Sequence, residues 1–283
     1  MDYKESIETY LSREYLSYSL LPFQFGEYYL FLYQLIGNKE KELPTDLILK
    51  LNKLFVCANL LDDIMDEDNE DIEKIDNLND EFPMYLRNLF SSIESELSKK
   101  EYLAFIVSIA NSLHYQNIEN KSRLTIEITE NNYFSLYVKR SVFLLQAAVP
   151  FIENHDLNAL YISTKYLAYF GQIKNDIADL RGPKSKDLLD NRPTLPLIKA
   201  ISHAIKEGND EIINLILTIN EKNYSHNSYG KILRFINERE ILEQCAKLSL
   251  FFFDKARKEL IIHFPEKKDY IDSFFTKLIA KDV

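Results

Sequence analysis

Two short acidic segments have the residue types and spacing to do chemistry. The first is Leu60-Leu61-Asp62-Asp63-Ile64-Met65-Asp66, and the second is Asn175-Asp176-Ile177-Ala178-Asp179. In a helix, Asp62, Asp63 and Asp66 project from a single face. Like charges this close repel one another, and a divalent cation, which prefers oxygen ligands, turns that repulsion into binding. Either cluster alone is more typical of a solvated helix face, whereas the two together favour a metal site.

The second cluster belongs to a longer polar stripe at helical spacing, made of Gln172, Asn175, Asp176 and Asp179. The residues just before it, 166–170, are nearly all apolar, so we expect this helix to be buried where the stripe begins. A buried carboxylate is costly without a cation partner. If the two acidic helices face each other across a bundle, their carboxylates could share a metal cluster.

Oxygen ligands indicate Mg²⁺ in preference to zinc, because none of the five histidines has a metal-site spacing. Mg²⁺ held by carboxylates commonly carries a phosphate substrate, which also needs basic side chains. The candidates are Arg140, Lys174, Arg181, Lys184, Lys186 and Arg192. Arg140 is the strongest candidate for binding phosphate because it interrupts an apolar run. Lys184 and Lys186 could equally be solvated residues of a loop.

The elements that must position these residues are helices. Gly 6 and Pro 8 are low counts for 283 residues, and no sustained alternation of polar and β-branched residues appears. We expect Gly37-Asn38 to end one helix, Pro44 to open the next, Asp156 to cap another and Gly182-Pro183 to end it, with Pro193 and Pro196 opening a further helix. Other helical patterns cover roughly 82–98, 101–117, 124–152, 236–264 and 268–281. No Pro/Gly/Ser-rich linker interrupts the chain, which favours one all-α domain over residues 1–283.

Composition narrows the function further. The formal charge of −10, from 44 acidic and 34 basic residues, argues against non-specific nucleic-acid binding. Two cysteines, Cys57 and Cys245, do not make a disulfide framework, so a reducing cytoplasm fits best. The N-terminus lacks the order of a signal peptide, and no apolar run reaches the roughly 18 residues of a membrane span.

Taken together, the motifs resemble those of the polyprenyl synthetase superfamily, the trans-isoprenyl diphosphate synthases. Asp62-Asp63-Ile64-Met65-Asp66 is similar to the first aspartate-rich motif, and residues 170–179 are similar to the second, with Asn175 at a usual aspartate position. Downstream, Lys186-Asp187-Leu188 and Arg192-Pro193-Thr194-Leu195-Pro196 resemble the family's Lys-Asp-Leu and Lys-x-Thr-Leu-Pro. Arg140-Ser141 falls where the family has Lys-Thr.

The resemblance implies an all-α isoprenoid-synthase bundle around a deep apolar cavity, with Mg²⁺ gripping the diphosphate of an allylic prenyl substrate. The implied metal ligands and catalytic residues are Asp62, Asp63, Asp66, Asp176 and Asp179. Residues near the diphosphate would be Arg140, Ser141, Gln172, Asn175, Lys186 and Arg192. Cys57 and Ala58 would line the cavity for the prenyl tail, although ordinary helix packing is the favoured explanation for Cys57. Family members are often homodimers, and no residue here identifies an interface.

Two departures from the family pattern bear on the acceptor. Chain-elongating members carry basic residues near the N-terminus and an Arg pair after the first motif, and both help bind isopentenyl diphosphate. Here residues 20–37 contain no Lys or Arg, and the acidic run Glu67-Asp68-Asn69-Glu70-Asp71 follows the first motif. A second diphosphate would be repelled by that run, which argues against ordinary chain elongation.

The acidic run Asp66-Glu67-Asp68-Asn69 and the Lys174-Asn175-Asp176 form of the second motif resemble the ComQ-type enzymes, which prenylate a tryptophan of a quorum-sensing pheromone precursor. The leading hypothesis is therefore a Mg²⁺-dependent prenyltransferase that moves a geranyl or farnesyl group to a peptide. A terpene cyclase or an atypical prenyl diphosphate synthase on the same fold is the second hypothesis. A non-catalytic subunit of a prenyl synthase is disfavoured because this chain keeps both acidic clusters, and a purely structural bundle is least favoured.

Overall fold

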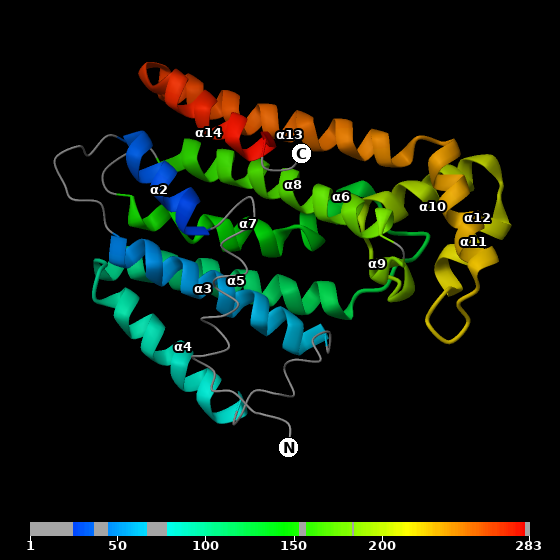
Figure 1. Cartoon of the computed structure of the whole chain (residues 1–283), viewed down its shortest axis with the longest axis horizontal. Coiled ribbons are helices and arrows are strands. Elements are labelled where there is room, and N and C mark those ends of the chain that lie inside the picture. Colours follow the sequence, from blue (N-terminus) through cyan, green and yellow to red (C-terminus); the bar gives the residue numbers. More distant parts are fainter. Residues whose placement is uncertain (1–24, 37–44, 67–77, 153–156, 183, 281–283) are drawn as a thin grey trace. The chain divides into compact units, whose positions relative to one another are not determined.

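The structure is a computed structural model that describes residues 25–36, 45–66, 78–152, 157–182 and 184–280, without the side chains of residues 25–27, 59, 62–66, 78, 79 and 280. Throughout these residues every regular element is a helix (Figure 1). The prediction of an all-α chain is confirmed. None of the described helices is both long and apolar enough to cross a membrane.

The chain divides into two compact units. Unit 1 comprises residues 1–107, 147–160 and 260–283, and unit 2 comprises residues 108–146 and 161–259. Three long helices contribute residues to both units: α5 (Lys99–Lys121), α8 (Leu157–Arg181) and α13 (Ile241–His263).

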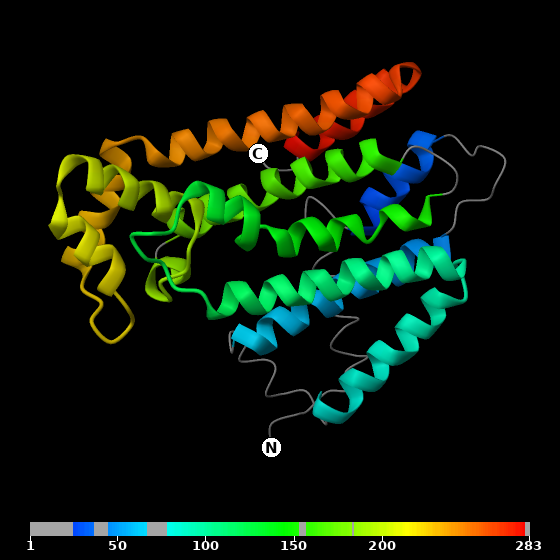
Figure 2. The same cartoon turned by 180° about the vertical axis from the view of Figure 1, so that it is seen from behind.

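Unit 1 is built around an aromatic core. Its other helices are α2 (Phe25–Ile36), α3 (Thr45–Asp66), α4 (Leu78–Glu94), η3 (Val149–Phe151), η4 (Pro265–Lys267) and α14 (Lys268–Ala280). α3 packs against α2 and α4, and α14 packs against α2 (Figure 1, Figure 2). The rings of Phe31 and Phe274 stack with centroids 3.8 Å apart. α3 buries the side chains of Leu47, Leu51 and Leu54 and carries the first acidic cluster in its last turns.

Unit 2 contains the second acidic cluster. Its other helices are α6 (Glu130–Asn132), the π-helix η2 (Tyr133–Tyr137), α7 (Lys139–Gln146), α9 (Lys186–Leu189), α10 (Leu195–Glu207), α11 (Asp210–Thr218) and α12 (His226–Glu238). α10 contacts α6, α11 and α12. It buries one apolar face that includes Leu197, Ile198 and Ile201, and it ends at Gly208, whose φ of 65° suits a residue without a Cβ.

Several predicted helix boundaries agree with the structure. α8 ends at Arg181, directly before Gly182, and α10 begins at Leu195 with Pro196 in its first turn. The first turn of a helix tolerates proline because its backbone N–H groups have no partner within the helix. The predicted signals at Gly37-Asn38, Pro44, Asp156 and Pro183 lie outside the described residues.

The prediction of one helix over residues 124–152 is wrong. Residues 122–129 are not helical, and a capping box between Thr129 and Asn132 starts a new helix at Glu130. That helix passes through the π-turn of η2 into α7 and then into a 3₁₀ turn that contains Pro150. The predicted helix over 236–264 is also divided, because α12 ends at Glu238 and Glu240 adopts a left-handed φ of 51°.

Candidate functional site

The site in unit 2 is organised by the last turns of α8. The predicted stripe forms on one helix, but its members differ in exposure: Asp176 is only 2% exposed, Gln172 and Asp179 are half-buried, and Asn175 faces solvent. The apolar neighbours Ile173 and Ile177 belong to the core of the unit. Among the four residues of the stripe, Asp176 is therefore the most buried.

The buried carboxylate of Asp176 accepts three hydrogen bonds. The hydroxyl of Tyr133 and the backbone N–H of Leu195 donate to Oδ2 over 2.8 and 3.0 Å, and the amide of Gln172 donates to Oδ1 over 3.0 Å. Burial raises the pKa of Asp176, and these hydrogen bonds oppose that rise because they favour the charged form. Asp176 therefore joins α8 to η2 and to the first residue of α10.

Two further predicted residues are connected to Asp176. The hydroxyl of Ser141 on α7 donates to Oε1 of Gln172 over 2.9 Å. This bond orients the Gln172 amide so that its nitrogen faces Asp176. Ser141, Gln172 and Asp176, which the sequence assigned to one site, are consequently brought together in a continuous hydrogen-bonded chain.

Asp179 lies one turn further along α8 and binds the start of α9. Its carboxylate accepts hydrogen bonds from the Ser185 hydroxyl and, over 3.1 Å, from the backbone N–H of Lys186. Ser185 also caps α9 by accepting from the N–H of Leu188 over 3.1 Å. The loop after α8 is thereby fixed to the second acidic cluster, and the predicted residue Lys186 contacts the cluster through its backbone.

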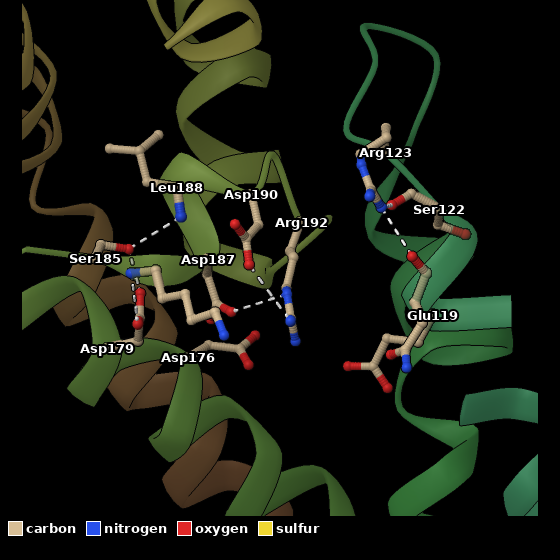
Figure 3. Close-up of polar contacts among 12 residues, drawn as sticks. Glu119, Ser122, Arg123, Asp176, Asp179, Ser185, Asp187, Leu188, Asp190 and Arg192 are labelled. Atoms are coloured by element: carbon tan, nitrogen blue, oxygen red, sulfur yellow. Dashed lines mark hydrogen bonds and ion pairs between the residues drawn. The ribbon is translucent and has the colours of Figure 1, made fainter. Parts of the chain in front are cut away.

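Asp187 is a member of this site to which the sequence reasoning assigned no role, although the Lys-Asp-Leu motif contains it. Burial raises its pKa to about 8, and the charges of Asp179 and Asp176 add to the rise while Arg192 opposes it. Figure 3 shows Asp176, Asp187 and Arg192 turned toward one another, with Glu119 projecting from α5 toward the same group. The structure thus adds a third aspartate to the neighbourhood of Asp176 and Asp179.

The two arginines predicted to bind diphosphate are both paired with carboxylates. Arg192 lies 3.9 Å from Asp187 and 3.4 Å from Asp190 (Figure 3). Arg140 lies 3.4 Å from Glu119, and its side chain is 21% exposed. Glu119 explains how an arginine can interrupt the apolar run of α7, because a buried charge needs a partner. No motif signalled Glu119, which lies in the last turn of α5 and is separated from Arg140 by a loop, α6 and η2.

The first acidic cluster is helical, as expected. Asp62, Asp63 and Asp66 lie in the last turns of α3, and Asp66 is its final residue. Their side chains and the acidic residues 67–71 lie outside the described part of the structure. Just upstream, Cys57 is buried and Ala58 is half-buried. Burial raises the pKa of the Cys57 thiol to about 12, so it stays protonated at neutral pH.

The donor set of unit 2 suits a hard cation in part. Asp176, Asp179 and Asp187 offer the carboxylate oxygens that Mg²⁺ prefers. Asp176 already accepts three hydrogen bonds, and the described residues contain no group of three acidic, histidine or cysteine side chains placed to hold a metal by themselves. Asp176, Asp179 and Asp187 therefore match Mg²⁺ in ligand chemistry but form no complete metal site among the residues that the structure describes.

Comparison with known proteins identifies the fold. No family model and no curated protein matches the sequence. Among solved structures, heptaprenyl diphosphate synthase from Staphylococcus aureus is similar at a TM-score of 0.73 and 14% identity, covering 90% of this chain and 85% of that one. Geranylgeranyl pyrophosphate synthase from Bacteroides thetaiotaomicron is similar at 0.69 and 17%, covering 89% and 86%.

A polyprenyl synthase from Caulobacter crescentus, crystallised with calcium and isoprenyl diphosphate, is similar at a TM-score of 0.71 and 14% identity, covering 90% of this chain and 82% of that one. The chain therefore has the all-α isoprenoid-synthase fold, as the motifs predicted. At these identities the likeness shows the fold alone.

Proposed function

We propose that this chain is a Mg²⁺-dependent prenyltransferase that ionises geranyl or farnesyl diphosphate and transfers the prenyl group to a tryptophan of a pheromone precursor peptide in the cytoplasm. The observation that carries the proposal is the group formed by Asp176, Asp179, Asp187 and Arg192 within this fold. Carboxylates and an arginine side by side suit a substrate that is bound as a metal diphosphate.

The proposal assigns Mg²⁺ to the carboxylates of both acidic clusters. The proposed ligands are Asp62, Asp63, Asp66, Asp176 and Asp179. When bound, Mg²⁺ would act as a Lewis acid that stabilises departing pyrophosphate. The protein's own contribution is a rigid frame, since Asp176 and Asp179 are fixed by donors from η2, α8, α9 and α10.

Basic residues complete the diphosphate site. Arg140 and Arg192 are each held by carboxylates, and a guanidinium has enough N–H groups to bind phosphate oxygens as well. We assign Lys186 to the same role, with Ser141 and Gln172 fixing Asp176 beside them. We assign Asn175, which faces solvent on α8, to the same diphosphate site. Cys57 and Ala58 are assigned to the prenyl tail.

We assign the prenyl acceptor from the charge of the residues that follow the first acidic cluster. The acidic residues 67–71 would repel the diphosphate of isopentenyl diphosphate, whereas an indole carries no charge. In the proposed step the bond between prenyl C1 and the diphosphate oxygen breaks, and C1 forms a bond to the indole ring. Pyrophosphate leaves, and transfer at a ring carbon or nitrogen that carries hydrogen releases one proton.

The test is a product analysis with Mg²⁺ and either geranyl or farnesyl diphosphate. One sample receives isopentenyl diphosphate and another receives a tryptophan-containing precursor peptide, and each is analysed by mass spectrometry. We expect a prenylated peptide. An elongated diphosphate or a cyclic hydrocarbon would instead identify the second candidate, an atypical synthase or terpene cyclase, and no turnover in any sample would favour a non-catalytic subunit.

A further inference from the structure

Tyr133 contacts the second acidic cluster from outside every motif that the sequence reveals. It lies on η2, far along the chain from Asp176, and is 2% exposed. Its hydroxyl donates to Oδ2 of Asp176 over 2.8 Å, and both side chains are fully buried at this contact. Burial and the nearby charge of Asp176 raise the pKa of Tyr133 well above its ordinary value, so the phenol keeps its proton.

A capping box and a π-turn fix the position of Tyr133. The capping box of Thr129 and Asn132 starts the helix at Glu130, three residues before the π-turn begins at Tyr133. The N–H of Val138 then donates to the carbonyl of Tyr133 over 3.1 Å, which is the five-residue bond of a π-helix. Tyr133 and Tyr137, at the two ends of the turn, are both buried. Single π-turns of this kind are frequent at functional sites.

The hydroxyl of Tyr133 supplies one of the three hydrogen bonds that the Asp176 carboxylate accepts. Oδ2 of Asp176 has two donors, Tyr133 and the N–H of Leu195, whereas Oδ1 has Gln172. Without the hydroxyl, one position at Oδ2 loses its donor inside the protein, where a missing hydrogen bond is costly. The carboxylate would then lose part of the orientation that fixes its remaining lone pairs.

We propose that Tyr133 is a positioning residue that orients the Asp176 carboxylate for Mg²⁺–diphosphate binding, an inference that rests on the proposed function. Residues that hydrogen-bond to a metal ligand typically change metal affinity by about 10–100-fold when they are removed. Tyr133→Phe removes one oxygen and leaves the ring in place. The affinity for Mg²⁺ should therefore fall while the fold is retained.

The experiment measures thermal stabilisation of the intact protein by Mg²⁺ in the presence of inorganic pyrophosphate. Each variant is compared with its own metal-free Tm, so a change in basal stability does not enter the result. Tyr137→Phe is the matched control: Tyr137 is buried on the same turn, and its hydroxyl forms no hydrogen bond with any residue that the structure describes. We expect the Mg²⁺ concentration at half-maximal shift to rise about tenfold or more in Tyr133→Phe and to stay unchanged in Tyr137→Phe.

A second variant tests whether Tyr133 acts through Asp176. In Asp176→Asn the orientation of a charged carboxylate is already lost, so adding Tyr133→Phe should cause little further change in the Mg²⁺ midpoint. Additive effects of the two substitutions would contradict the inference.

The outcomes separate the two proposals. A wild-type protein that Mg²⁺ and pyrophosphate do not stabilise would overturn the proposed function, and the role of Tyr133 with it. A wild-type shift that Tyr133→Phe retains at the same midpoint would overturn the role of Tyr133 alone. A lower basal Tm with an unchanged midpoint would mean that Tyr133 is only a packing residue.

Discussion

Nε of Arg192 lies 3.9 Å from Oδ1 of Asp187, and the backbone N–H of Arg192 donates to the carbonyl of Asp187 over 2.8 Å. Even with this partner, burial and two neighbouring aspartates raise the pKa of Asp187 to about 8. The pair shows that the carboxylates of the site outnumber the positive charge that unit 2 places beside them. A cation bound beside Asp187 would favour its ionised form.

Asp187 predicts a pH-dependent stability. Its folded pKa of about 8 exceeds the ordinary value of 3.8, so the folded state favours the protonated carboxyl. The stability that this protonated group contributes is fully present below pH 4 and is lost as the pH rises toward 8. Asp187→Asn removes that loss. In EDTA we expect the variant to gain Tm relative to wild type between pH 5 and 8, by about 2 °C or more at pH 8.5.

Asp190→Asn is the control for this experiment, because Asp190 also pairs with Arg192 but is more exposed, at 34% against 22% for Asp187. An equal gain in both variants would assign the effect to the surroundings of Arg192 in place of the burial of Asp187. A flat Tm difference for Asp187→Asn over the same range would show that Asp187 is ionised in the apo protein.

The first cluster predicts a loss of activity. Asp63→Ala should reduce prenyl transfer by more than about 100-fold, because loss of a metal ligand exceeds the roughly 10–100-fold effect of its hydrogen-bonded partners. The measurement is steady-state turnover with farnesyl diphosphate at saturating Mg²⁺. Asp80→Ala, an exposed aspartate in the first turn of α4, is the control and should stay near wild type. Near-normal turnover in Asp63→Ala would remove the first cluster from the metal site.

Arg140 predicts a change in substrate affinity. A hydrogen bond to a charged group contributes about 1.5–3 kcal/mol, so Arg140→Gln should raise KM for the prenyl diphosphate by about 10–100-fold. Lys139→Gln is the neighbouring control, since the Lys139 ammonium lies over the Phe143 ring and was assigned no role. Equal KM values for the two variants would assign Arg140 to its ion pair with Glu119 alone.

Two glycines predict stability changes of opposite sign. Gly208 ends α10 with φ of 65°, where a side chain costs about 1–2 kcal/mol, so Gly208→Ala should destabilise the fold. Gly230 lies within α12 with open space where a Cβ would be, so Gly230→Ala should stabilise by about 0.5–1 kcal/mol. Urea unfolding measures both, and changes of the same sign would contradict the assigned backbone conformations.

Much of the fold follows from local signals in the sequence. Gly182 and Pro196 mark the end of α8 and the start of α10 because each acts through its own backbone geometry. The break before Glu130 was missed because apolar residues continue through the π-turn, and periodicity alone does not register a capping box made of Thr129 and Asn132.

Some residues of the site could be predicted from local spacing, and others could not. Gln172, Asp176 and Asp179 could be placed together because helical spacing fixes their face. The contacts of Asp176 with Tyr133 and with the N–H of Leu195 depend on how α8 packs against η2 and α10, and no spacing within one segment reveals them. Tyr133 is one of 18 tyrosines, and only tertiary structure distinguishes it from the others.

The contrast between Asn175 and Asp176 has a practical consequence for directed evolution. Asn175 faces solvent, so a saturation library at this position samples new side chains at little cost to folding. Asp176 is hydrogen-bonded to three residues, so most replacements there would leave a buried donor without its partner and destabilise the fold. A library that alters this part of α8 without unfolding the protein should therefore randomise Asn175 and keep its neighbour constant.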